Sequence, residues 1–222
     1  WENKVDDKVK GKIAWEVTDK WDDSHIQKFR DFTSYMADKN YNDKYTCEDY
    51  ALSLLIFYAK ANGLPLILKN GTGTYKPDEE YSCGIGGCTA AGFKLFFSNV
   101  LSTTGAPDVQ SMSSEVDKND VQVGDMPMSL SSKGIATHVQ VVTNITANVI
   151  YIRQGNTDRS ALRIMDESVP GSSGYIGVRV QSGYYVRKNG NYFNTSTNTN
   201  QIGLWNDKLL KVYFWNLLDF NY

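Results

Sequence analysis

The stretch that decides the fold is DKYTCEDYALSLLIFYAKANGLPL, residues 43–66. Its apolar residues recur at helical spacing and share one face with Cys47. These residues are Ala51, Leu54, Leu55, Tyr58 and Ala59. Gly63 and Pro65 stand where a C-terminal glycine and a following proline usually end a helix. The stretch therefore predicts a buried helix that ends near residue 62.

The start of this helix is also specified. Thr46 is expected as the N-cap, and Asp49, three residues on, completes a capping-box pattern. Tyr45 and Tyr50 occupy the two positions of a hydrophobic staple. Cys47 is then the first helical residue.

At that position Cys47 has three interpretations: a small core residue, half of a disulfide, or a nucleophile. Free N–H groups and the helix dipole favour an anion at a helix start and lower a thiol pKa. The acidic neighbours Glu48 and Asp49 act in the opposite direction. A nucleophilic Cys47 therefore needs a basic partner from elsewhere in the chain.

The other two cysteines, Cys83 and Cys88, lie in SCGIGGC, whose glycines allow a short disulfide-closed loop. In an oxidising compartment Cys47 would then be the odd, reactive thiol. Three reduced cysteines of a cytosolic protein are the alternative. A closed zinc site needs about four ligands, which these cysteines and two histidines hardly supply, so we expect no metal or cofactor.

Two histidines are candidates for the basic partner. His25 lies in a polar helical segment, where a solvated surface histidine is expected. His138 lies in THVQVV, a predicted strand on which His138 and Gln140 share a face. If Thr143 pairs with Val149 in the following hairpin, His138 faces Gln154, and a shifted register offers another neighbour.

The IRQGN stretch ends that hairpin and supplies two amides, Gln154 and Asn156. Either amide could orient the imidazole of His138. The ordinary interpretation of QGN is a turn after a strand.

The rest of the chain predicts an α+β protein, with helices first and strands later. We expect a single domain over residues 1–222, with its core motifs in 43–158 and a strand-rich extension in 171–222. Segments 69–92 and 102–120 are expected as loops that wall a substrate groove. The 23 basic and 25 acidic residues give a net charge of -2 without a basic run, so we expect no nucleic-acid partner. No run approaches the ~18 apolar residues of a membrane span.

Together, TCEDYALSLLIFYAKANGLPL, VGDMPM, THVQVV and IRQGN resemble the papain-like cell-wall hydrolases, the CHAP and NlpC-type cysteine peptidases and amidases. The resemblance implies a papain-like fold, with Cys47 as the nucleophile and His138 as the general base. It implies Gln154 or Asn156 as the orienting residue, Gln154 standing where CHAP domains tend to have glutamate. Many such enzymes cut peptide or amide bonds of peptidoglycan, and some are antibacterial toxins, which implies an immunity protein as a possible partner.

Two other functions remain open. CEDYA followed by GLPL is similar to transglutaminase-like proteins, in which Asp158 would be the third catalytic residue and an amine the acceptor. A non-catalytic secreted binding module would instead use the aromatic residues of the tail: Tyr175, Tyr184, Tyr185, Tyr192, Tyr213 and Trp215. The chain opens WENKVDDKVKGK, which we interpret as a mature or trimmed chain of a secreted or periplasmic protein.

Overall fold

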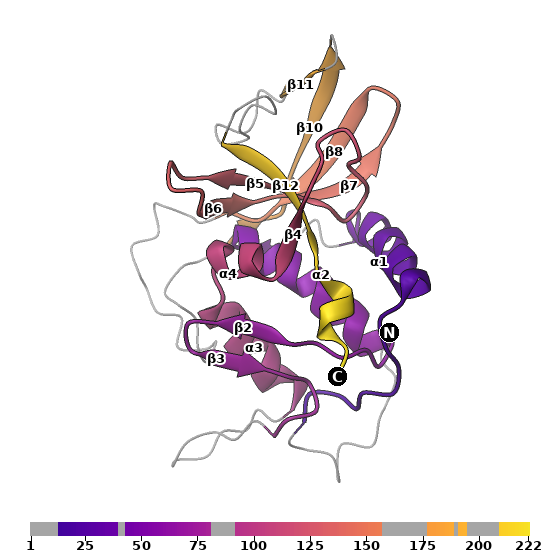
Figure 1. The fold of residues 1–222 in the computed structure, drawn as a ribbon, viewed down its shortest axis with the longest axis vertical. Helices are drawn as coiled ribbons and strands as arrows, with labels where there is room; N and C mark the ends of the chain where they lie inside the picture. Colours follow the sequence, from indigo (N-terminus) through magenta and orange to yellow (C-terminus); the bar gives the residue numbers. More distant parts are fainter. Residues whose placement is uncertain (1–12, 40–42, 81–91, 157–176, 189–190, 195–208) are drawn as a thin grey trace.

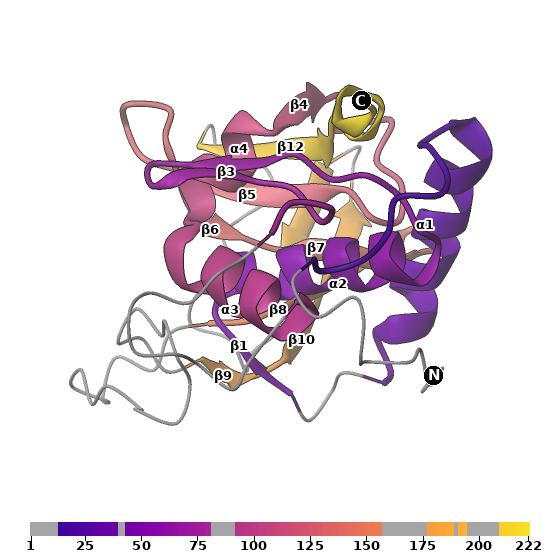
Figure 2. The same cartoon turned by 90° about the horizontal axis from the view of Figure 1, so that it is seen from below.

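The computed structural model describes residues 13–39, 43–80, 92–156, 177–188, 191–194 and 209–222, and it has the expected α+β class. Helices and antiparallel sheets pack together (Figure 1), with one large hydrophobic cluster and a smaller one. The smaller cluster consists of Val142, Ile150, Ile152, Tyr185, Leu210 and Val212. Helix α2 (Cys47–Ala61) lies below the two larger sheets in Figure 1 and contacts β6 (Ala136–Val139), β8 (Val149–Gln154), α3 (Phe93–Thr103) and α4 (Ala106–Ser111); Figure 2 shows α3 beside it. The N-terminal end of α2, where Cys47 lies, is therefore enclosed by other elements.

Helix α2 (Cys47–Ala61) confirms the central prediction from the sequence. It is buried on all sides, because Leu52 and Ile56 are as inaccessible as the predicted apolar face. At its end Gly63 adopts a left-handed φ of 62°, and the Leu64 N–H donates to the Ala59 carbonyl at 2.9 Å. This is the glycine-terminated stop expected for a helix that must turn sharply.

The capping box predicted at the start of α2 is not formed. Thr46 is the N-cap, but its hydroxyl makes no capping hydrogen bond, and Asp49 Oδ1 is buried without a hydrogen-bond partner. Tyr45 packs on Tyr50 with ring centroids 6.0 Å apart, as expected for the predicted staple. The staple is therefore the part of the predicted helix start that the structure has.

Helix α1 (Asp23–Met36) is tied to the turn that precedes β5 (Met126–Leu130). The Arg30 guanidinium donates to the buried Asp125 carboxylate at 2.8 Å and lies 3.9 Å from the centre of the Phe214 ring. Asp125 also accepts the Gln122 N–H at 2.7 Å. The Gly124–Asp125 turn, within the VGDMPM stretch, therefore anchors α1 to the sheets.

Two four-stranded antiparallel sheets follow, with strand orders β4-β12-β5-β6 and β11-β10-β8-β7. Their remaining strands are listed here: β4 (Ser113–Val116), β6 (Ala136–Val139), β7 (Val141–Ile145), β8 (Val149–Gln154), β10 (Gln181–Lys188), β11 (Asn191–Asn194) and β12 (Leu210–Trp215). The predicted strands in the tail are confirmed at β10 and β12. A shorter pair joins β1 (Lys44–Tyr45) to β9 (Val178–Arg179) just ahead of α2.

The predicted hairpin register is wrong. The run THVQVV is divided at Gln140, whose N–H donates to the Pro127 carbonyl at 2.9 Å. Strand β6 pairs with β5, so the backbone partner of His138 is Ser129. Strand β7 pairs with β8 through Val141↔Arg153, with a register shift further along.

The two segments expected as loops contain regular structure. Residues 69–92 include most of the hairpin of β2 (Leu68–Asn70) and β3 (Gly73–Tyr75). Residues 102–120 contain α4 (Ala106–Ser111) and β4, and the run FKLFFSNVL lies in α3 (Phe93–Thr103). A 3-10 helix, η1 (Leu217–Phe220), ends the chain beside Trp21, whose backbone N–H and carbonyl both bond the Asn221 side chain.

Candidate active site

Cys47 lies in the first turn of α2, with its thiol turned toward strand β6. The residue is 8% exposed. The backbone N–H of Val139, the residue after His138, faces the sulfur. The thiol S–H donates to the Glu48 carboxylate at 2.8 Å.

The Cys47 thiol is protonated in this environment. Burial raises its pKa well above the usual range, and the charge of Glu48 and its hydrogen bond raise it further. The N–H groups of Val139 and Glu48 act in the opposite direction but are weaker. The expected lowering of the thiol pKa by the helix start is thus outweighed by desolvation and one carboxylate.

His138 projects from β6 and is held at one ring nitrogen. Its Nε2–H donates to Gln154 Oε1 at 2.8 Å. A neutral ring protonated at Nε2 has its lone pair on Nδ1, the atom that can accept a proton. Burial lowers the pKa of His138, opposed by the Gln154 bond and the negative charge of Glu48, so the resting ring is neutral.

A chain of amides fixes the orientation of Gln154. The buried Tyr185 hydroxyl donates to Gln140 Oε1 at 2.8 Å, and Gln140 Nε2 donates to Gln154 Oε1 at 3.0 Å. Gln154 Nε2 donates in turn to Gln181 Oε1 at 2.9 Å. Gln154 Oε1 therefore accepts from both Gln140 and His138, which requires the proton on His138 Nε2.

The same end of β8 also holds the backbone that leads into Cys47. The Asn156 N–H donates to the Tyr45 carbonyl at 2.9 Å. A Cβ atom on Gly155 would lie 2.5 Å from that oxygen and closer still to the Thr46 carbonyl oxygen. Only a residue without a side chain permits this approach, so the QGN tripeptide joins the histidine side of the site to the cysteine side.

The structure therefore joins the side chains of His138 and Gln154, and it places the backbone of β6, through the Val139 N–H, against the Cys47 sulfur. Of the two amides predicted to orient His138, Gln154 makes the contact, whereas the Asn156 side chain donates to Gln181 at 3.4 Å. The contact arises across two sheets and not from the predicted strand pairing. Cys83, Cys88 and Asp158 lie outside the described residues, so the disulfide and the alternative third residue are not placed.

His25 lies away from this site, on α1. Its Nδ1 is 3.1 Å from the Tyr58 hydroxyl and its Nε2 is 3.2 Å from an Asp19 carboxylate oxygen. The sequence analysis missed the roles of Gln181 and Tyr185 in the amide chain. No local signal marks either residue, because both come from β10, beyond a long intervening segment.

The aromatic tail is mostly core. Tyr185, Tyr213 and Trp215 are buried, whereas Tyr184 is exposed and lies beside Tyr151 across the sheet, with ring centroids 6.2 Å apart. Tyr175 and the Tyr192 side chain are not described. Of the four described aromatic side chains of the tail, Tyr185, Tyr213 and Trp215 therefore belong to the packing of the sheets.

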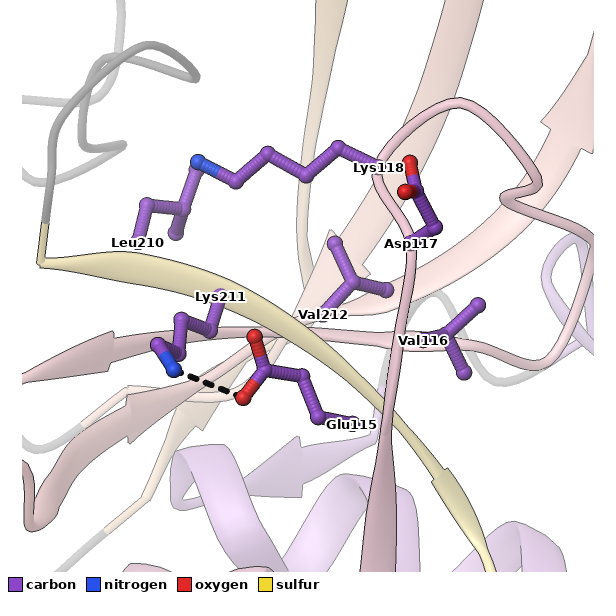
Figure 3. A pocket seen from close by; sticks show the side chains of 7 residues that line it. All are labelled: Glu115, Val116, Asp117, Lys118, Leu210, Lys211 and Val212. Atoms are coloured by element: carbon purple, nitrogen blue, oxygen red, sulfur yellow. Dashed lines mark hydrogen bonds and ion pairs between the residues drawn. The ribbon is translucent and has the colours of Figure 1, made fainter.

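A pocket of about 330 Å³ lies between β4 and β12. Figure 3 shows the Lys211–Glu115 ion pair at its edge, with Val212 and Lys118 nearby. Neither Cys47 nor His138 lines it. Among the described residues, no cluster of three or more His, Cys, Asp or Glu side chains is placed to bind a metal ion, and no helix has the length and apolar character to cross a membrane.

These contacts define a candidate site in which His138 is hydrogen-bonded to Gln154 and Cys47 lies against the strand that carries His138. Comparison of the chain with protein-family models, curated proteins and solved structures found no match.

Proposed function

We propose that the protein is a cysteine-dependent hydrolase that cleaves peptide or amide bonds, with a papain-like arrangement of its site. The observation that carries the proposal is the His138 Nε2–H bond to Gln154, made from the strand that passes the Cys47 thiol. This bond leaves Nδ1 as the basic nitrogen of a buried, neutral imidazole.

In the proposed reaction, His138 Nδ1 takes the Cys47 proton as the sulfur attacks a carbonyl carbon. The Cys47 backbone N–H, in the first turn of α2 and without a helical partner, helps to hold the oxyanion. His138 then protonates the departing amine and activates water to release the acyl group from the thioester. Because both groups start neutral, the proton transfer accompanies attack and does not precede it.

The choice of peptidoglycan as substrate comes from the resemblance of the four motifs to cell-wall hydrolases. It implies a secreted or periplasmic protein and, for an antibacterial toxin, a dedicated inhibitor protein. Transfer to an amine, as in transglutaminase-like proteins, uses the same thioester and differs only in the acceptor.

The test is digestion of purified peptidoglycan, with the fragments identified by mass spectrometry. We expect cleavage by the wild-type protein and a loss of at least about 10³-fold in Cys47→Ala and His138→Ala. His25→Ala is the matched control, since it removes the other histidine and should leave the rate unchanged. Cleavage that persists in folded Cys47→Ala protein would refute the mechanism.

Adding a primary amine to the same digestion separates the two acceptors. A hydrolase gives free carboxyl ends, whereas an acyltransferase gives amide adducts of the amine. Mass spectrometry distinguishes the two products directly.

A further inference from the structure

The first turn of α2 places a carboxylate on the candidate nucleophile. Glu48 Oε2 accepts the Cys47 S–H at 2.8 Å, so the thiol hydrogen points to Glu48 and not to His138. The negative charge of Glu48 also acts on His138 and raises the pKa of that imidazole. One side chain therefore contacts the thiol and acts through its charge on the imidazole.

The other groups around the thiol do not duplicate this effect. From β6, the Val139 N–H is a neutral donor to the sulfur. On α2, Asp49 turns back to Thr46, and on β1 the Tyr45 hydroxyl interacts with Ser53. The end of β8 contributes only amides. Among the described residues, Glu48 is the charged side chain that acts on both Cys47 and His138.

We infer that Glu48 is a positioning residue of the site, which holds the resting Cys47 as a hydrogen-bonded thiol and supplies His138 with the negative charge that Gln154 lacks. The inference rests on the proposed roles of Cys47 and His138. A bound substrate displaces the thiol from Glu48, and the proton passes from sulfur to His138 Nδ1. The carboxylate then faces an imidazolium, which it stabilises.

This role explains how an amide serves as the third residue. Gln154 orients the ring but cannot compensate its positive charge. Glu48 provides that charge from α2, the helix that also carries the nucleophile. Orientation and electrostatic stabilisation are thus divided between two residues.

The test is Glu48→Gln, which keeps the shape of the side chain and removes its charge. Iodoacetamide alkylation of Cys47 is followed at fixed pH by mass spectrometry of the Cys47 peptide. Because a thiolate becomes more abundant but less nucleophilic as its pKa falls, we expect alkylation to become about threefold to fourfold faster for each unit by which the thiol pKa decreases. Glu79→Gln, which removes an exposed carboxylate elsewhere, is the matched control and should alkylate at the wild-type rate.

A histidine NMR titration gives the second result. The pKa of His138 should fall in Glu48→Gln, together with that of the thiol. A purely structural role for Glu48 would not move both values in the same direction. Glu48→Ala is measured alongside as a second variant, and the same two shifts are expected.

Unchanged alkylation in the folded variants would overturn the inference even if hydrolysis depends on Cys47. If the protein hydrolyses nothing, the proposed function fails. The alkylation rate and the NMR titration still report whether Glu48 controls the pKa of the thiol and of the imidazole.

Discussion

Replacing Gly155 with alanine would place a methyl group against the backbone that leads into Cys47. The new Cβ would lie 2.5 Å from the Tyr45 carbonyl oxygen and closer to that of Thr46, whereas ordinary contacts begin at 3.4 Å. The two segments must therefore separate by about 1 Å. Neither can move freely, because the Asn156 N–H is bonded to Tyr45 and β1 is paired with β9.

We expect this overpacking to lower the free energy of unfolding by about 1–3 kcal/mol. The melting temperature should fall by about 2–4 °C for each kcal/mol. Hydrolysis should suffer more than stability, because a misplacement of about 1 Å between reacting groups costs about 10²-fold in rate.

Urea unfolding and peptidoglycan digestion, measured on the same preparation, check both expectations. Gly71→Ala is the matched control, since a Cβ there meets nothing within 4 Å. It should change stability by less than about 0.5 kcal/mol. A Gly155→Ala protein with wild-type stability and rate would refute the argument that this glycine joins the two sides of the site.

Three further perturbations test the scaffold and the site. Arg30→Met leaves the buried Asp125 carboxylate unpaired and should cost about 3–5 kcal/mol in urea unfolding. Gln154→Leu removes the acceptor of the His138 Nε2–H and should cost about 1–3 kcal/mol, with a loss of hydrolysis above about 10²-fold at an unchanged fold by circular dichroism. Burial raises the pKa of Asp49 from 3.8 to about 7, so the folded protein holds that proton more tightly and loses stability as pH rises through this range. Asp49→Asn should flatten that part of the stability profile, and an unchanged profile would contradict the assignment.

Much of the cysteine side of the site could be predicted from local sequence. The staple tyrosines and the glycine stop lie within one turn of the ends of α2, where short-range rules apply. These features depend on neighbours in sequence, and the structure has them where they were expected. The predicted capping box is the exception, because Asp49 Oδ1 has no hydrogen-bond partner.

The histidine side depends on contacts that sequence cannot reveal. The run THVQVV alternates like one strand, and nothing in it marks Gln140 as the point where the chain leaves one sheet for the other. The predicted proximity of His138 and Gln154 is present, but the predicted reason for it is wrong. The two residues are not partners in one hairpin, and their side chains meet across two sheets. The β2–β3 hairpin and α4 were missed because elements of three to six residues carry too few positions to show a period.

The amide chain behind His138 has a consequence for the conditions in which the protein can work. Carboxylates that orient a histidine lose their charge in acid, and the ring is then released from its preferred tautomer. Gln140, Gln154 and Gln181 do not titrate, so their hydrogen bonds persist from acid to alkali as long as the fold does. The orientation of the His138 ring is therefore insensitive to acidity. A protein exposed to acid and returned to neutral pH would recover this geometry without any of the three glutamines having to regain a charge.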